Sequence, residues 1–126
     1  SLDRESLLKE LAKQLANRPQ TSLDVFIELN LTDDPGRGGV QPKDLLSFAS
    51  KVIEVSQLNL LGVMGVAGLG ANPSAEFERV AKASADLRSI SPKSGYISAG
   101  MSADFEQAIA QGATHIRVGT AITGNR

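Results

Sequence analysis

Two short segments near the C-terminus carry the residue types that could bind an anion. Ser102 follows the run YISA (96–99) and opens a segment with helical character, which is the position of a helix N-cap. Backbone N–H groups and the helix dipole converge at such a point and suit a phosphate. The second segment is Gly119-Thr120, where glycine permits close approach and threonine offers an N–H and a hydroxyl. Taken singly, each could be only a cap or a strand-ending turn.

Alternating helices and strands must position these two segments. Apolar periodicity predicts a helix containing Leu7 to Leu15, and further helices after Pro42, after Asn72-Pro73-Ser74, and from about 103 to 111. Strands are expected at 23–31, 58–66, 96–99 and 114–119. This order predicts a parallel sheet built from right-handed crossovers, with both anion-binding segments at the carboxyl ends of neighbouring strands.

The two faces of the predicted strands differ in polarity. One face of the first strand is apolar, whereas the other carries Asp24, Phe26, Glu28 and Asn30. A strand between two helical layers is usually apolar throughout, so a barrel interior is favoured over an open sheet with one solvated face. Because buried charges must pair, Glu28 or Asp24 is expected near Arg117 or His115. Arg37, in the loop DDPGRGG (33–39), is expected to be a solvated charge or to guide an anionic ligand.

Length and composition set limits on the class of protein. Residues 1–126 are expected to form a single domain, a half barrel of about four strands and four helices. A full barrel needs about 250 residues, so the half barrel is expected to be a fragment that requires its missing N-terminal half or self-association. A net charge of −1, no cysteine and no long apolar run predict a cytoplasmic protein without nucleic-acid, membrane or metal partners.

The run ISAGMSADFEQAIAQGATHIRVGTAITGNR (97–126) closely resembles the end of the pyridoxal phosphate homeostasis protein family. SLDR, VFIELNL with the later GRGGV, and LLGVMGV resemble that family in the same order. The resemblance implies an α/β fold of parallel (β/α) units, the C-terminal half of a TIM (β/α)₈ barrel of the alanine racemase type. It also implies a protein that binds pyridoxal 5′-phosphate for vitamin B6 homeostasis and has no catalytic turnover.

The same resemblance implies roles for particular residues. Ser102 and Gly119-Thr120 would hold the phosphate, or a sulfate in its place. Arg117 would face the pyridine nitrogen, keep it unprotonated and weaken the ring as an electron sink, which suits a carrier. The implied cofactor-binding set is Ser102, Gly119, Thr120, Arg117, Met64 and Met101.

The Schiff-base lysine of the family is expected upstream of Ser1, and none of the lysines in this chain is a convincing substitute. Weak, non-covalent cofactor binding is therefore expected. Two alternatives remain open: a fragment of an enzyme of this barrel type, such as an amino-acid racemase, and a structural half barrel that assembles with a partner or with itself. Tyr96 lies at the start of its strand, at the wrong mouth for a racemase tyrosine.

Overall fold

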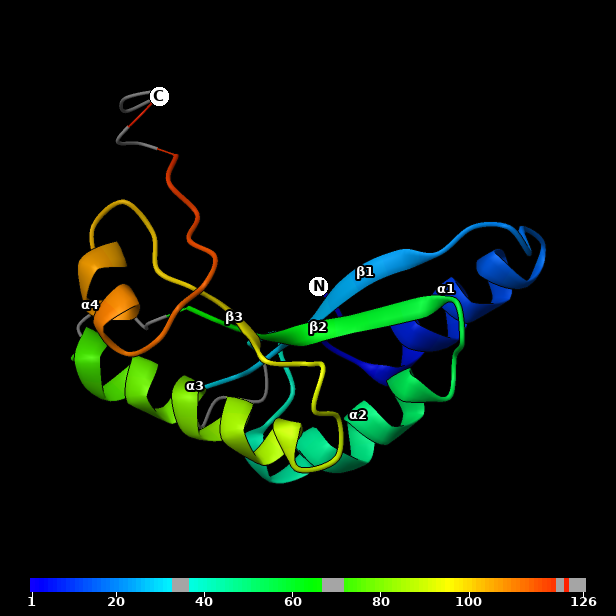
Figure 1. The fold of residues 1–126 in the computed structure, drawn as a ribbon, viewed down its shortest axis with the longest axis horizontal. Coiled ribbons are helices and arrows are strands. Elements are labelled where there is room, and N and C mark those ends of the chain that lie inside the picture. The colour runs from blue at the N-terminus through cyan, green and yellow to red at the C-terminus, as the bar shows by residue number, and fades with distance from the viewer. Residues whose placement is uncertain (33–36, 67–71, 120–121, 123–126) are drawn as a thin grey trace.

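The computed structural model describes residues 1–32, 37–66, 72–119 and 122. The described part contains a parallel sheet in the order β1-β2-β3, with strands β1 (Leu23–Glu28), β2 (Leu58–Gly65) and β3 (Tyr96–Ala99). Between and around the strands lie α1 (Glu5–Ala16), the 3₁₀ helix η1 (Pro42–Asp44), α2 (Leu45–Ile53), α3 (Pro73–Arg88) and α4 (Phe105–Ala110). The predicted alternation of helices and parallel strands is confirmed (Figure 1).

The segment after α4 lies beside β3 as a fourth, less regular strand. His115 pairs with Ser98 in a parallel bridge, and the Ala99 N–H donates to the His115 carbonyl at 3.0 Å. The Arg117 N–H donates to the Gly100 carbonyl at 2.9 Å. The regular strand expected over 114–119 is reduced to this bridge and the backbone bonds around it.

The sheet curves strongly. Four strands about 4.8 Å apart would place the first and fourth about 14 Å from each other in a flat sheet. The rings of Phe26 on β1 and His115 on the fourth strand nevertheless lie 5.4 Å apart, edge to face. The helices form an arc along the opposite side of the sheet (Figure 1). These features are those of a barrel wall, and the face carrying Phe26 and His115 is called the concave face below.

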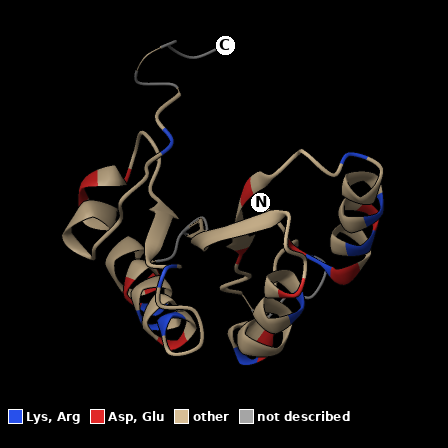
Figure 2. Ribbon diagram, turned by 45° about the vertical axis from the view of Figure 1, so that its right-hand side comes forward, with Lys and Arg blue, Asp and Glu red and all other residues tan. Residues whose placement is uncertain are grey.

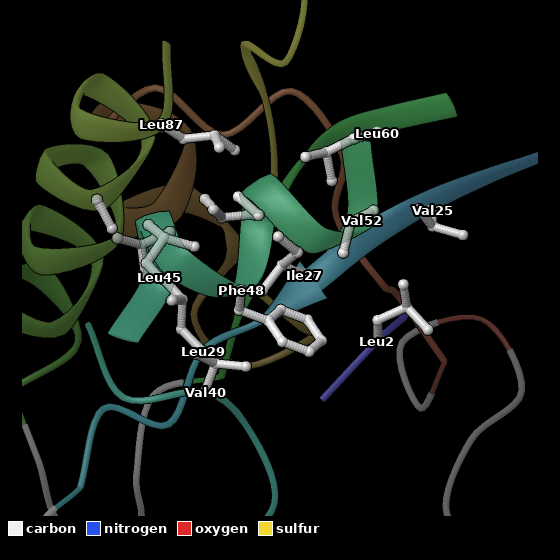
Figure 3. Packing of buried hydrophobic residues seen from close by; sticks show 14 of the residues in the cluster. Leu2, Val25, Ile27, Leu29, Val40, Leu45, Phe48, Val52, Leu60 and Leu87 are labelled. Atoms are coloured by element: carbon white, nitrogen blue, oxygen red, sulfur yellow. The ribbon is translucent and has the colours of Figure 1, made fainter. Parts of the chain in front are cut away.

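The hydrophobic core lies on the helix side of the sheet. Figure 3 shows Ile27 of β1 among Leu45, Phe48 and Val52 of α2. Gly65 of β2 lets α3 approach closely, since a Cβ there would lie 2.6 Å from Val80 Cγ2.

The buried stripe of α2 differs from the sequence prediction. Helical spacing after Pro42 predicts an inward stripe of Leu45, Leu46, Ala49, Val52 and Ile53. Leu46 and Ile53 are instead 39% and 44% exposed, and Phe48 is buried. The helix begins at Leu45, and the helical period then places residues 45, 48, 49 and 52 on one face.

Two helix ends match the sequence signals. The Asn72 side chain caps α3 by accepting from the N–H groups of Ser74 at 3.0 Å and Ala75 at 3.4 Å. Gly112 ends α4 with a φ of +103°, its N–H donating to Ile109, while the Ala113 N–H donates to Ala108. This bonding pattern is a Schellman motif, and the glycine after residue 111 is the signal in the sequence that predicts a helix end there.

Charged residues lie mainly on the helices, with few on the strands (Figure 2). Within the described ranges, no helix combines the length and the apolar character needed to cross a membrane.

The chain leaves β1 through a polar anchor at Asn30, which is 3% exposed. Its Nδ2 donates to the Arg37 carbonyl at 3.0 Å, and its Oδ1 accepts from the Thr32 N–H at 2.9 Å and from Thr32 Oγ1 at 2.7 Å. The Asn30 N–H donates to the Val40 carbonyl. β1 therefore ends at Glu28 rather than at residue 31, because Asn30 forms hydrogen bonds with Val40, Arg37 and Thr32 instead of pairing with β2.

Replacing Asn30 with alanine should lower the free energy of unfolding by about 1–3 kcal/mol, since it leaves partly buried backbone groups of Thr32 and Arg37 without this partner. Urea denaturation would measure the change. Asn59→Ala is the matched control, because Asn59 is exposed and its Nδ2 donates to Asp24 Oδ1 at 3.0 Å. Equal losses from both variants would contradict the anchoring role.

Replacing Ser84 with alanine should raise the free energy of unfolding by about 1 kcal/mol. Ser84 on α3 is 1% exposed, and its hydroxyl has no hydrogen-bond partner in the described structure, so its burial is unfavourable. Thermal and urea unfolding would test this. Ser50→Ala on α2 controls for helix propensity, because the Ser50 hydroxyl is exposed and bonds the Leu46 carbonyl. A gain no larger than the control's would refute the explanation.

Candidate functional site

The two predicted anion-binding segments leave neighbouring strand ends. The hydrogen bond from the Arg117 N–H to the Gly100 carbonyl fixes these two residues side by side. Ser102 and Gly119 each follow two residues later, so both segments start at the same edge of the sheet. Thr120 lies outside the described residues.

Ser102 does not cap α4, contrary to the sequence prediction. The helix begins at Phe105, with Asp104 in the N-cap position, and Ser102 lies half-buried in the preceding turn. Gly100 has a φ of +98°, and Asp104 Oδ1 accepts the Met101 N–H at 2.8 Å. These two features bend the chain through an extra turn before the helix. An anion at Ser102 would therefore meet a polar turn and not a helix end.

Gly119 is exposed, and neither its φ nor its packing requires a glycine. It is not among the glycines with positive φ, and a Cβ added to it would meet no described atom within 4 Å. Gly100 contrasts with it, since a Cβ there would lie 2.7 Å from the Cβ of Ala108. The open space at Gly119 would let a ligand approach the backbone.

The guanidinium of Arg117 reaches past β3 to β2. Its Nη2 donates to the Gly65 carbonyl at 3.1 Å, and its Nε is buried without a hydrogen-bond partner among the described residues. A buried N–H of this kind calls for an acceptor. This orphaned donor, together with the open space at Gly119, fits a ligand that carries acceptor atoms.

The expected ion pairs of the concave face do not form among the described residues. Arg117 bonds Gly65 and not Glu28, because it lies beyond the level at which Glu28, Met64, Ser98 and His115 are in register. Asp24 accepts from Asn59 instead of pairing with a cation. Opposite charges on this face are therefore not brought into contact by the sheet.

His115 has a structural environment. Its ring contacts Phe26 at 5.4 Å and Tyr96 at 5.5 Å, both edge to face, and its Nδ1 lies 2.9 Å from Thr114 Oγ1. The His115 side chain is exposed, and its described contacts are with these aromatic rings and the threonine hydroxyl. The described residues also contain no cluster of three or more His, Cys, Asp or Glu side chains that could hold a metal ion.

The two methionines differ in their surroundings. Met64 is half-buried near the end of β2, directly before the Gly65 carbonyl that Arg117 contacts. Met101 is 45% exposed beside Ser102, and its N–H is bound by Asp104. Arg117 therefore reaches the strand end that carries Met64, while Met101 lies with the Ser102 turn.

A cavity of about 240 Å³ opens at the ends of β1 and β2, lined by residues 28–32, 37–38 and Val66. Sequence reasoning identified Arg37 as a loop charge but did not place it beside Glu28 in a cavity. The polar inner face of the first strand, with Glu28 and Asn30 two residues apart, was the signal that could have indicated it.

Comparison with known proteins gives consistent matches along the whole chain. The model of the alanine racemase N-terminal domain family matches residues 1–126. The pyridoxal phosphate homeostasis protein of Corynebacterium glutamicum is 34% identical over 132 residues, which cover 100% of this chain and 60% of that protein.

Solved structures agree with these sequence matches. PipY of Synechococcus elongatus is 30% identical and superposes with a TM-score of 0.86 without its cofactor, over 98% of this chain and 60% of PipY. The PipY structure with pyridoxal phosphate bound gives a TM-score of 0.84 over 98% of this chain and 59% of PipY. This chain thus spans about 60% of the length of these relatives, and its fold is part of an alanine racemase-type barrel. The chain belongs to the alanine racemase N-terminal domain family.

Proposed function

We propose that the chain holds the phosphate of pyridoxal 5′-phosphate and serves cofactor homeostasis in the cytoplasm without catalytic turnover. The observation that carries the proposal is the pairing of Gly100 with Arg117, which starts the Ser102 and Gly119 segments at one edge of the sheet. Relatives named pyridoxal phosphate homeostasis proteins and the cofactor-bound structure of PipY support the choice of ligand.

The residues present suit this cofactor. The Ser102 hydroxyl and the Gly119-Thr120 backbone would hold the phosphate, Arg117 would contact the ring nitrogen, and Met64 and Met101 would line the ring. The bound cofactor supplies an electron-withdrawing ring. The Arg117 guanidinium is permanently charged and can only donate, so it opposes protonation of the ring nitrogen and weakens that withdrawal. This arrangement supports a holding role.

Cofactor binding by this chain is proposed to be non-covalent. All the lysines are exposed. Four lie on helices α1, α2 and α3, Lys43 lies on η1, and Lys93 precedes β3 at the end of the sheet opposite Ser102. No lysine is therefore proposed as an anchor for the cofactor.

We also propose that the concave face is covered in the assembled protein, either by the remaining part of the barrel or by a second copy of this chain. Tyr96 is 46% exposed on this face, and the fourth strand has an open edge in the described structure. The greater length of the relatives supports the first possibility.

Replacing Ser102 and Thr120 together with alanine should weaken cofactor binding by about 1–3 kcal/mol, the scale of hydrogen bonds to a charged group. Titration followed by cofactor absorbance or fluorescence would measure it. A second titration with inorganic phosphate should show a parallel loss. The matched control is Ser22→Ala with Ser56→Ala, two exposed serines away from the strand ends concerned. Unchanged affinity in the first variant would overturn the phosphate assignment.

The isolated chain should associate in solution if a second copy covers the concave face. Light scattering coupled to size-exclusion chromatography should then give about twice the 13.2 kDa chain mass. Tyr96→Glu should shift the mass to that of a monomer, because it places a charge in the covered face. A monomer at every concentration of the unmodified chain would exclude self-association and leave the remaining part of the barrel as the covering partner.

A further inference from the structure

The cavity at the ends of β1 and β2 is separate from the segments proposed to hold the phosphate. Its walls come from residues 28–32, 37–38 and Val66, whereas Ser102 and Gly119 follow β3 and the fourth strand. Its volume of about 240 Å³ is slightly below the roughly 300 Å³ at which small-molecule sites begin. This size suits a single small metabolite.

A negatively charged residue, Glu28, and a positively charged residue, Arg37, line this cavity and do not form an ion pair with each other. Glu28 is half-buried and Arg37 is exposed. In the described part of the chain, no hydrogen bond or ion pair engages the Glu28 carboxylate or the Arg37 guanidinium. Two opposite charges that face one cavity and remain unpaired offer separate contacts to a ligand that carries both signs.

A second carboxylate, that of Asp3, lies near Gly38, outside the cavity wall and with its Oδ1 3.7 Å from Arg4 Nε. A Cβ added to Gly38 would lie 3.1 Å from Asp3 Oδ2 and 3.5 Å from Glu28 Oε2, so both carboxylates flank this glycine. The cavity therefore has an acidic end at Glu28 and a basic residue on the loop that follows β1. Such an asymmetry favours one orientation of a ligand with an ammonium and a carboxylate group.

The backbone around the cavity is held in place before any ligand arrives. The buried side chain of Asn30 bonds the Arg37 carbonyl and both the N–H and the hydroxyl of Thr32. Both ends of the loop that bears Arg37 are thus tied to the end of β1. The backbone therefore loses little conformational entropy on binding, and the ordering cost falls on the exposed Arg37 side chain.

The remaining wall is apolar. Leu29 and Leu31 are buried beside the polar groups, and Val66 is 42% exposed at the end of β2. We propose that this cavity binds a free amino acid as its zwitterion. Glu28 binds the ammonium group, Arg37 binds the carboxylate, and the apolar wall receives an aliphatic side chain. The proposal goes beyond cofactor binding and uses none of the residues assigned to the phosphate.

Three probes test the charge requirements on the unmodified chain: L-valine, N-acetyl-L-valine and L-valinamide. Isothermal titration and amide chemical shifts would give the affinities. Valine should bind about tenfold more tightly than either derivative, since each derivative lacks one of the two charges. Absence of saturable valine binding, or equal binding of N-acetylvaline, would overturn the proposal, the latter because it would reveal a simple anion site.

Variants that remove one charge each test which residue binds the ammonium group and which binds the carboxylate of the ligand. Glu28→Gln should abolish the preference for valine over N-acetylvaline, and Arg37→Gln should abolish the preference over valinamide. Glu54→Gln and Arg18→Gln, at exposed positions outside the cavity, should change neither preference. If circular dichroism shows that Glu28→Gln is poorly folded, Arg37→Gln and the three probes still test whether the cavity binds an amino acid. Losses no larger than those of the controls would refute the assignment.

The same variants separate this proposal from the proposed cofactor function. Of the two, Arg37→Gln should bind pyridoxal phosphate within about twofold of the unmodified chain, because Arg37 contacts none of the described residues assigned to the cofactor. Glu28→Gln is not used for this comparison, since Glu28 is in register with Met64. Loss of cofactor binding in Ser102→Ala with intact valine binding would support two separate sites. Retention of valine preference in both cavity variants would overturn the amino-acid site and leave the cofactor proposal unaffected.

Discussion

At Gly62 the sheet has no room for any side chain. A Cβ at this position would overlap the carbonyl oxygen of Tyr96, the residue with which Gly62 is in register on β3. The backbones of β2 and β3 can pair here only because position 62 is a glycine. β3 in turn holds the fourth strand through the bonds of Ala99 and Gly100. The placement of the Ser102 turn and of Arg117 therefore depends on one close contact between two backbones.

One face of the sheet packs against the helices and stabilises the fold, and the other face carries polar groups that could bind a ligand. Aliphatic side chains from the strands and helices bury against each other on the helix side, where burial of apolar area stabilises the fold. The concave face carries the charged and aromatic side chains, such as Glu28, His115 and Arg117. Glu28 and Arg117 form no ion pair with each other, and the Nε of Arg117 has no hydrogen-bond partner among the described residues.

The sequence predicted most of the fold, since periodicity reports which face of an element is buried. The run at 96–99 and the capped helix after Asn72 were placed correctly. The buried face of α2 was misassigned because its phase depends on where the helix begins, and the 3₁₀ turn at Pro42 sets that point.

The candidate site was predicted in outline and missed in detail. The strand order placed Ser102 and Gly119 at one edge. The cap at Ser102 failed because the turn depends on a bond between Asp104 and the Met101 N–H, which no local periodicity reports. The expected pairing of Arg117 with Glu28 failed because the level of each residue along its strand is set by the register between strands.

The contact of Arg117 with the Gly65 carbonyl joins two strands that are not neighbours, since β3 lies between them. The terminal segment is thereby fastened both to β3 and across it to β2. Local fraying of this segment must break the Arg117 contact as well as the backbone bonds. A ligand bound at Arg117 would disfavour this opening by mass action, so amide hydrogen exchange in the terminal segment would slow in proportion to occupancy. The edge strand of the sheet can thus report, through its own dynamics, whether the site beside it is filled.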